Sequence, residues 1–244
     1  MNLLVSDYDG TFATNEKDIQ LNRKMIERFI KNGNKFLLSS GRSLKSLKEQ
    51  VKMYKIPYNY LGVSDGNFMY DEKDNLIMQN YMSSDIISEI EELLQLGIYI
   101  QIQYTYSREN SLSMKDDEEL GSIAFVIERD KITEEFLELY KRVEKENPKY
   151  QYDVYSYKDI FYYMIRPKGI NKSSPIIHLE HTLHIPKSKI YTIGDNINDI
   201  EMIRDYNGFM IGDNDSVRKE ALRKYNAVHE LIKDINNNKV LKRW

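Results

Sequence analysis

The chain opens with a short apolar run, a polar turn and a segment with apolar residues at helical spacing. The run 3–5 predicts a buried strand, and the polar turn begins at Asp7. Apolar residues that share one helical face then follow: Met25, Ile26, Phe29 and Ile30. Gly33 stands where that helix is expected to end, because glycine is common just after a helix. The first 33 residues therefore predict one strand–turn–helix unit.

The same pattern returns three more times. The strand 35–39, the turn 40–42 and a helix from Ser43 follow directly; Leu44, Leu47 and Val51 form the apolar face of that helix. Near the other end, the apolar runs 190–193 and 208–212 are each followed by a helical pattern, the last expected to continue through 218–225. Alternating strands and helices with short connections predict an α/β, doubly wound parallel sheet with helices on both faces.

The middle of the chain follows a different pattern. Residues 97–106 alternate strictly, with Ile98, Ile100, Ile102 and Tyr104 on one side. Such alternation is typical of an antiparallel strand with one solvated face. The run 122–128 predicts a second strand, a helix is expected from Thr133, and further strands are expected over 150–157 and 161–167. We therefore expect a catalytic core of residues 1–81 and 166–244, with an inserted α+β domain over residues 82–165.

Composition narrows the class of protein. The 244 residues suit one large domain or two small ones, since a domain averages ~150 residues. A formal net charge of −3 gives no reason to expect nucleic acid or an anionic membrane as a partner. Cysteine is absent, which excludes disulfides and thiol catalysis. No apolar run approaches ~18 residues, and Asp7 comes too early for a signal peptide, so a cytoplasmic protein is expected.

Pairs of carboxylates at two predicted strand ends indicate a metal site. Asp7 and Asp9 lie two residues apart, so they point to the same side of an extended chain. Two unit charges ~4 Å apart repel by about 4 kcal/mol at an effective dielectric constant near 20. Asp195 and Asp199 would join them, because the carboxyl ends of parallel strands meet at one edge of the sheet. An all-oxygen cluster suits Mg²⁺, although turn and helix-cap carboxylates are the simpler alternative.

Two further segments suggest that a phosphate group binds at the same edge. Ser40 and Gly41 offer a hydroxyl and backbone N–H groups at the start of a helix, a favourable place for an anion. Lys172 precedes the helix expected near Pro175, where its charge would neutralise phosphate and carboxylates alike.

These segments together resemble a known family. The four motifs are DYDGT (7–11), SSGR (39–42), GINKSS (169–174) and GDNINDIEM (194–202). In type, order and spacing they resemble the haloacid dehalogenase superfamily of phosphohydrolases. The long interval between the second and third motifs resembles its Cof-type branch, which carries a large α/β cap there (type IIB). The resemblance covers residues ~1–80 and ~166–244 and implies a Rossmann-like core.

The resemblance implies a Mg²⁺-dependent phosphatase acting on small phosphorylated metabolites such as sugar phosphates. Asp7 would be the nucleophile and form an aspartyl-phosphate, while Asp9 would act as acid and then base. Mg²⁺ would be held by Asp7, the backbone carbonyl of Asp9, Asp195 and Asp199, the last directly or through water. The implied phosphate-binding residues are Ser40, Gly41, Lys172 and Asn198. Arg42 would either face the substrate or pair with a carboxylate.

Some questions stay open at the level of sequence. The stretch 64–71 stands where the family has an Asn-Gly-Ala turn, so Asp65 or Asn67 either contacts substrate or belongs to a plain hairpin turn, the simpler reading. The same scaffold also fits a non-catalytic sensor of a phosphorylated ligand, or a phosphomutase. The mutase is disfavoured because no cap fits between the first two motifs. The oligomeric state is left open, and a monomer is compatible with the sequence.

Overall fold

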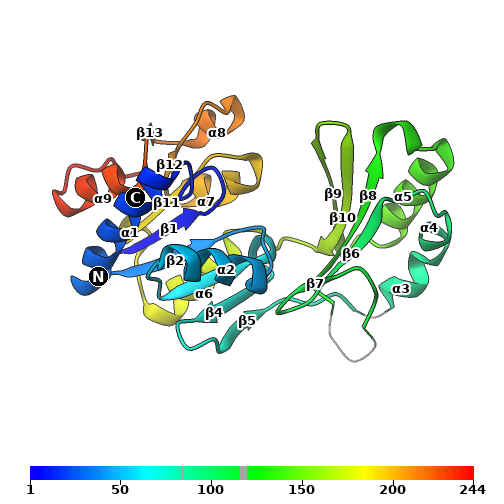
Figure 1. The fold of residues 1–244 in the computed structure, drawn as a ribbon, viewed down its shortest axis with the longest axis horizontal. Helices are drawn as coiled ribbons and strands as arrows, with labels where there is room; N and C mark the ends of the chain where they lie inside the picture. The colour runs from blue at the N-terminus through cyan, green and yellow to red at the C-terminus, as the bar shows by residue number, and fades with distance from the viewer. Residues whose placement is uncertain (84, 116–119) are drawn as a thin grey trace. The chain divides into compact units, whose positions relative to one another are not determined.

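The chain forms two compact units, which we call the core unit and the inserted unit. The computed structural model describes residues 1–83, 85–115 and 120–244 (Figure 1). The core unit comprises Met1–Gln79 and Asn171–Trp244, and the inserted unit comprises Asn80–Ile170. The domain boundary expected after residue 165 falls inside a strand of the inserted unit, β10 (Ile160–Pro167), which pairs along its whole length. The inserted unit therefore ends at Ile170 instead.

The core unit is built on an eight-stranded sheet with the order β13-β12-β11-β1-β2-β3-β4-β5. Its strands are β1 (Leu3–Asp7), β2 (Lys35–Ser39), β3 (Tyr60–Val63), β4 (Phe68–Asp71), β5 (Leu76–Gln79), β11 (Ile190–Gly194), β12 (Asn207–Met210) and β13 (Arg223–Lys224). Strands β13 through β3 pair in parallel, and β4 and β5 extend the sheet by antiparallel hairpins. The predicted α/β class with a parallel sheet is confirmed.

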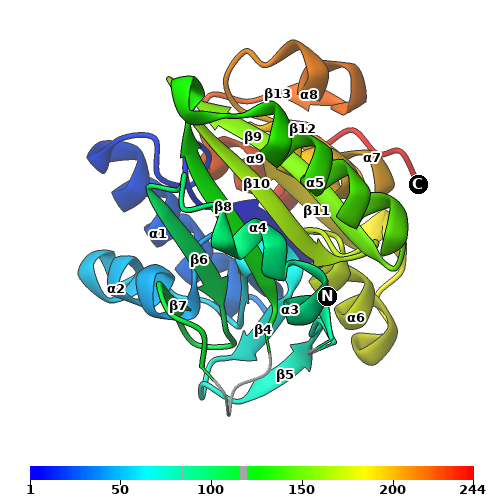
Figure 2. The ribbon, with the colours of Figure 1, turned by 90° about the vertical axis from the view of Figure 1, so that its right-hand side faces the viewer.

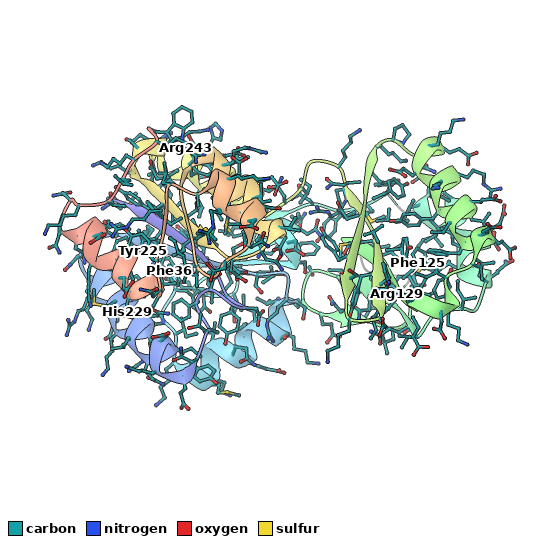
Figure 3. The ribbon with its side chains drawn as sticks, turned by 90° about the horizontal axis from the view of Figure 1, so that it is seen from above. Phe36, Phe125, Arg129, Tyr225, His229 and Arg243 are labelled. Atoms are coloured by element: carbon teal, nitrogen blue, oxygen red, sulfur yellow. The ribbon has the colours of Figure 1, made fainter. Side chains whose placement is uncertain are left out.

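Helices cover both faces of this sheet. They are α1 (Glu16–Lys31), α2 (Leu44–Tyr54), α6 (Ser174–Leu183), α7 (Ile200–Asp205), α8 (Asp215–Glu220) and α9 (Val228–Asn236). Leu3, Val5 and Leu37 face one side of the sheet and pack in one cluster with apolar residues of α6 and α7. Phe36 alternates with Leu37 and points to the other side, where its ring centroid lies 6.0 Å from that of Phe12 (Figure 3). Successive strand residues thus serve opposite layers, as expected for a doubly wound sheet.

One predicted helix is shorter than expected. The helical pattern through 218–225 ends at Glu220, and Arg223 and Lys224 instead pair in parallel with Phe209 and Met210 of β12. Strand β12 would otherwise present unpaired backbone groups at a sheet edge, and these groups need partners. Pairing across the sheet therefore overrides the local helical pattern.

The described residues of the inserted unit form a five-stranded antiparallel sheet with the order β7-β6-β8-β10-β9. Its elements are α3 (Ile86–Glu89), α4 (Glu91–Gln95), β6 (Gln101–Thr105), β7 (Asn110–Ser111), β8 (Ser122–Glu128), α5 (Glu134–Glu146), β9 (Tyr150–Tyr157) and β10 (Ile160–Pro167). Helices α4 and α5 lie against one face of the sheet (Figure 2). Phe125 and Phe136 meet edge to face in the core between sheet and helices, with ring centroids 6.3 Å apart.

The strand expected over residues 97–106 begins only at Gln101. Ile98 and Tyr99 are successive residues, yet both pack against the core of the inserted unit, and the chain bends so that Ile100 is 52% exposed. The alternation visible in the sequence therefore holds for Ile102 and Tyr104 but fails before them, because a bend changes which side of the chain is buried. In the part of the chain that the structure describes, no helix combines the length and apolar character needed to cross a membrane.

Candidate active site

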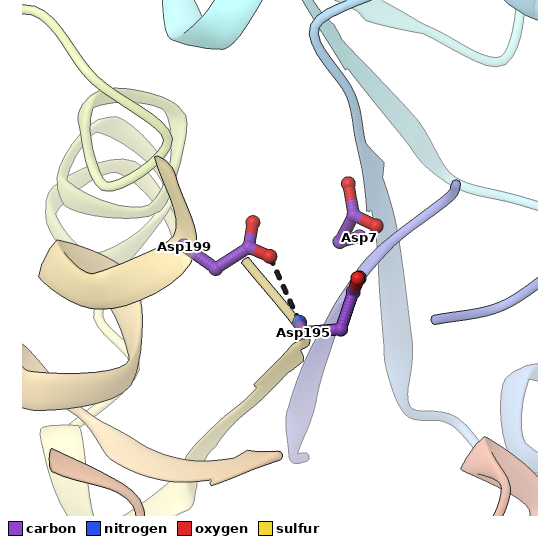
Figure 4. Close-up of side chains that lie close together, drawn as sticks. All are labelled: Asp7, Asp195 and Asp199. Carbon is purple, nitrogen blue, oxygen red and sulfur yellow. Dashed lines mark hydrogen bonds between the residues drawn. The ribbon is translucent and has the colours of Figure 1, made fainter. Parts of the chain in front are cut away.

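Three carboxylates meet where β1 and β11 end. Asp7 is the last residue of β1, Asp195 directly follows β11, and Asp199 lies in the turn before α7. Each offers an oxygen, and these oxygens all lie within 4.8 Å of one another (Figure 4). Register explains the meeting, because β1 pairs in parallel with β11 and Ser6 lies opposite Ile193. The sheet brings together residues that are almost 200 positions apart.

Lys172 lies at the centre of this cluster. Its side chain is 2% exposed, and its Nζ donates hydrogen bonds to Asp7 Oδ1 at 2.6 Å and to Asp199 Oδ1 at 2.7 Å. Burial by itself would lower the pKa of Lys172, but the charges of Asp199 and Asp7 outweigh it and raise the pKa. The lysine is therefore an ammonium ion at neutral pH. Its position directly before α6 is fixed by the turn at Asn171, whose carbonyl accepts the Ser174 N–H at 2.9 Å.

Asp199 has hydrogen-bond partners on both carboxylate oxygens. Oδ1 accepts a hydrogen bond from the Lys172 ammonium, and Oδ2 accepts one from each backbone N–H of Asp195 and Asn196, both at 3.0 Å. The dashed line in Figure 4 marks the bond from Asp195. The side chain is fully buried. Asp199 thus fixes both the turn that carries Asp195 and the position of Lys172. Such an engaged carboxylate fits a role through hydrogen bonds or water better than direct coordination of a metal.

Asp7 keeps one oxygen unused within the protein. Its Oδ2 is buried and has no hydrogen-bond partner among the residues that the structure describes, while Oδ1 accepts a hydrogen bond from Lys172. Burial raises the pKa of Asp7 well above its usual value, Lys172 opposes this, and the nearby Asp199 adds to it. A buried carboxylate oxygen without a partner is costly unless a cation or a reacting group completes its surroundings.

The cluster fits a divalent cation. Three carboxylates face one ammonium, which leaves excess negative charge in a largely buried place. Burial also raises the pKa of Asp195, whose Oδ1 accepts the Thr11 hydroxyl at 2.6 Å. Hard oxygen ligands of this kind suit Mg²⁺. Asp7 and Asp195 are the side chains best placed to hold it.

Asp9 and Arg42 form an ion pair beside this cluster. The guanidinium donates from Nε and Nη2 to the two carboxylate oxygens at 2.7 and 2.8 Å, a bidentate arrangement. Arg42 also donates to Ser46 Oγ at 3.0 Å, and its Cζ lies 5.5 Å from the centre of the Tyr8 ring. Of the two alternatives left open for Arg42, the structure therefore has it paired with a carboxylate. The Asp9 side chain remains 53% exposed and lies outside the group of three clustered carboxylates.

The predicted phosphate-binding residues also lie at this edge of the sheet. Ser40 follows β2 and is buried, and its Oγ accepts the Arg42 N–H at 3.2 Å. Gly41 is exposed and lies next to Asp65; a Cβ at Gly41 would be only 3.0 Å from Asp65 Oδ2. Asn198 donates from Nδ2 to Asp65 Oδ1 at 3.0 Å. Asp65 therefore links the second motif to the fourth.

Sequence reasoning assigned no role to two residues that contact this site. The Thr11 hydroxyl donates a hydrogen bond to Asp195. The sequence feature that points to Thr11 is its position as the last residue of the DYDGT motif. For Asp65 the sequence favours a plain hairpin turn, but in the structure its carboxylate lies among the residues of the site. The sequence feature that points to Asp65 is an aspartate in the stretch where the family has an Asn-Gly-Ala turn.

Comparison with known proteins identifies the family. The sequence model of the haloacid dehalogenase-like hydrolases matches residues 4–121 and 99–230. The chain therefore belongs to this family. It is 25% identical over 227 residues to 5-amino-6-(5-phospho-D-ribitylamino)uracil phosphatase YcsE of Bacillus subtilis, covering 90% of this chain and 87% of that protein.

Solved structures share the fold. A haloacid dehalogenase-like hydrolase from Bacteroides thetaiotaomicron has a TM-score of 0.78 at 18% identity, covering 96% of this chain and 99% of the other. A HAD/COF-like hydrolase from Plasmodium vivax has a TM-score of 0.74 at 17% identity, covering 98% and 96%. The predicted membership of the haloacid dehalogenase superfamily and the predicted class of enzyme, a phosphatase of this superfamily, are confirmed.

The close approach of Gly10 to Asp195 gives a first prediction. Gly10 has φ +82°, and a Cβ there would lie 2.5 Å from Asp195 Oδ2. We expect Gly10→Ala to displace Asp195 and to lower stability by about 2 kcal/mol or more, because strain at positive φ adds to the clash. Gly33→Ala is the matched control, since Gly33 has φ +80° and a Cβ there would lie more than 4 Å from every atom considered in the described residues. Denaturant unfolding should show a smaller loss for Gly33→Ala; equal losses would contradict the clash.

Proposed function

We propose that this protein is a Mg²⁺-dependent phosphatase that hydrolyses phosphate monoesters of small metabolites through an aspartyl-phosphate. The observation that carries the proposal concerns Asp7: one carboxylate oxygen accepts a hydrogen bond from a buried ammonium, and the other has no partner in the described part of the chain. A nucleophile needs a fixed position and a free oxygen, and Asp7 has both.

In the first half of the proposed reaction, a carboxylate oxygen of Asp7 attacks phosphorus and the bond from phosphorus to the ester oxygen breaks. Asp9 gives a proton to the departing alkoxide, which leaves as an alcohol. Lys172 keeps the Asp7 carboxylate in place and offsets negative charge as the phosphoryl group transfers. Ser40, the Gly41 N–H and Asn198 would bind the phosphoryl oxygens.

In the second half, Asp9 removes a proton from water as the water oxygen attacks phosphorus. The bond from phosphorus to Asp7 breaks, which regenerates the carboxylate and releases inorganic phosphate. Asp9 needs a defined place in both halves, and Arg42 provides it through two hydrogen bonds. We therefore propose that Arg42 positions the acid–base residue.

Mg²⁺ would be held by Asp7, Asp195 and the backbone carbonyl of Asp9, with Asp199 acting through hydrogen bonds or water. When bound, it would neutralise charge on the transferring phosphoryl group. A small phosphorylated metabolite, such as a sugar phosphate, is the proposed substrate. The name of the Bacillus subtilis relative supports this class, since it describes a phosphate ester on a ribityl chain.

Removal of the nucleophile should abolish turnover. We expect Asp7→Asn to lower phosphate release from p-nitrophenyl phosphate and sugar phosphates by at least about a thousandfold, because the attacking carboxylate is lost. Phosphate release with Mg²⁺ is the measurement, and Glu72→Gln, an exposed change in the turn after β4, is the control. Tight binding of phosphate esters by the wild-type protein without any turnover would favour a sensor instead.

The two halves of the reaction should separate in Asp9→Asn. p-Nitrophenolate is a good leaving group and needs little help from an acid, whereas the attack of water still needs a base. We expect a burst of p-nitrophenolate, stoichiometric with enzyme, followed by turnover lowered by about 10²–10⁴-fold. Stopped-flow absorbance measures both phases. A variant that is slow from the first turnover, with no burst, would argue against a base role for Asp9.

Metal binding should appear in stability as well as in activity. We expect Mg²⁺ to stabilise the wild-type protein by about 2.7 kcal/mol at a hundredfold excess over its Kd, and Asp195→Asn to lose most of this gain. The gain should be larger at pH 7 than at pH 5. Burial raises the pKa of Asp195, so protons compete more strongly with the metal as pH falls. Thermal unfolding with Mg²⁺ and with EDTA is the measurement; identical curves would contradict the metal site.

A further inference from the structure

We propose that Asp65 tunes the phosphate pocket in two ways: it positions Asn198, and its fixed negative charge keeps the product, inorganic phosphate, weakly bound. This inference rests on the proposed phosphatase function and adds to it a residue that controls product affinity. Three observations support the inference. They are the contacts of the turn that carries Asp65, the contacts of the Asp65 carboxylate, and the balance of charge around that carboxylate.

The turn between β3 and β4 is held in an unfavourable backbone conformation. Ser64 and Asp65 both have φ +52°, and Gly66 has φ +92°. Left-handed conformations are uncommon for residues other than glycine, and two such residues in succession persist only where the surroundings impose them. The Ser64 N–H donates to the Arg42 carbonyl at 2.9 Å, and the Asp65 N–H donates to the Ser40 carbonyl at 3.2 Å. The second motif thus holds the turn in place.

The third motif holds the turn from the other side. A Cβ at Gly66 would lie only 1.9 Å from the Asn171 carbonyl oxygen, so the turn packs directly against the residue before Lys172. These constraints aim the side chain of Asp65 at the site.

The Asp65 carboxylate contacts two of the proposed phosphate-binding residues. Oδ1 accepts the Asn198 amide at 3.0 Å, which orients that side chain. The same carboxylate lies against Gly41, whose backbone N–H is a proposed phosphate ligand. Its charge also reaches Lys172: after the opposing effect of burial, Asp199 and Asp7 raise the pKa of this lysine most, and Asp65 adds to them.

Asp65 changes the balance of charge that an arriving phosphate meets. Asp7, Asp195, Asp199 and Asp65 carry four negative charges, and Lys172 together with a bound divalent cation would offset three. Arg42 is already paired with Asp9. Among these described residues, one negative charge therefore remains uncompensated, and it disfavours binding of a free phosphate dianion. An enzyme gains nothing by holding its product tightly, and this charge lowers product affinity without removing any phosphate ligand.

The test uses two variants that separate charge from positioning. Asp65→Asn keeps an oxygen that accepts the Asn198 amide, tolerates the left-handed backbone and removes only the charge. We expect its Ki for inorganic phosphate to fall roughly tenfold, as one unit charge a few ångströms from the ligand would produce, and its KM to fall with it. Asp65→Ala removes charge and hydrogen bond together, so its kcat should be lower than that of Asp65→Asn. Glu72→Gln removes a remote charge and should leave Ki unchanged.

The readouts are Ki for inorganic phosphate and kcat and KM for p-nitrophenyl phosphate, all with Mg²⁺. A wild-type Ki in Asp65→Asn would overturn the charge role, and equal kcat in the two variants would overturn the positioning role. Neither result affects the phosphatase proposal, which stands if the wild-type protein turns over. If it does not, the phosphatase proposal fails, and calorimetry with inorganic phosphate still tests the charge: equal affinities in wild-type and Asp65→Asn overturn it. Because Asp65→Asn preserves the turn, misfolding of Asp65→Ala leaves that test intact.

Discussion

The buried ammonium of Lys172 is the interaction on which the rest of the site depends. It joins the end of β1 to the turn after β11 through Asp7 and Asp199, both of which are buried. Carboxylates so close together would repel one another in a poorly solvated place, and either side without its partner would be a buried, uncompensated charge. The positive charge of Lys172 offsets part of the repulsion among the three carboxylates. The negative charge that remains is sufficient to attract a divalent cation.

The carboxylates of Asp199, Asp7 and Asp9 differ in their hydrogen-bond partners, and these partners indicate which role each can have. Both carboxylate oxygens of Asp199 accept hydrogen bonds from the protein, so this side chain shapes the turn. Asp7 has one oxygen bound by Lys172 and one with no partner among the described residues, which suits the nucleophile that we propose. Asp9 is half-exposed and held by Arg42, as suits a group that exchanges protons with substrate and water. The tasks proposed for these identical side chains therefore differ because their surroundings differ.

The pattern of apolar and polar residues predicted the structure correctly wherever interactions between neighbours in the sequence determine it. Helix α2 begins after Ser43, whose side chain caps it, and buries Leu44, Leu47 and Val51 as their spacing predicts. The pattern was wrong at Arg223 and Lys224. It predicts a helix there, but these two residues form a strand that pairs with the edge of β12. It failed again before Gln101, where a bend interrupts the alternation. In both places the outcome depends on a neighbour that the local sequence does not contain.

The sequence by itself determined that Asp7, Ser40 and Asp195 stand at carboxyl ends of parallel strands, because periodicity defines the strands and parallel topology aligns their ends. Only the tertiary structure decided which side chains pair there. Arg42 binds Asp9 across 33 positions of the chain, and Asp65 binds Asn198 across 133. Such pairings depend on distances of a few ångströms and on backbone angles in a strained turn. Motif spacing carries no information about either quantity, so the partners became visible only in the folded chain.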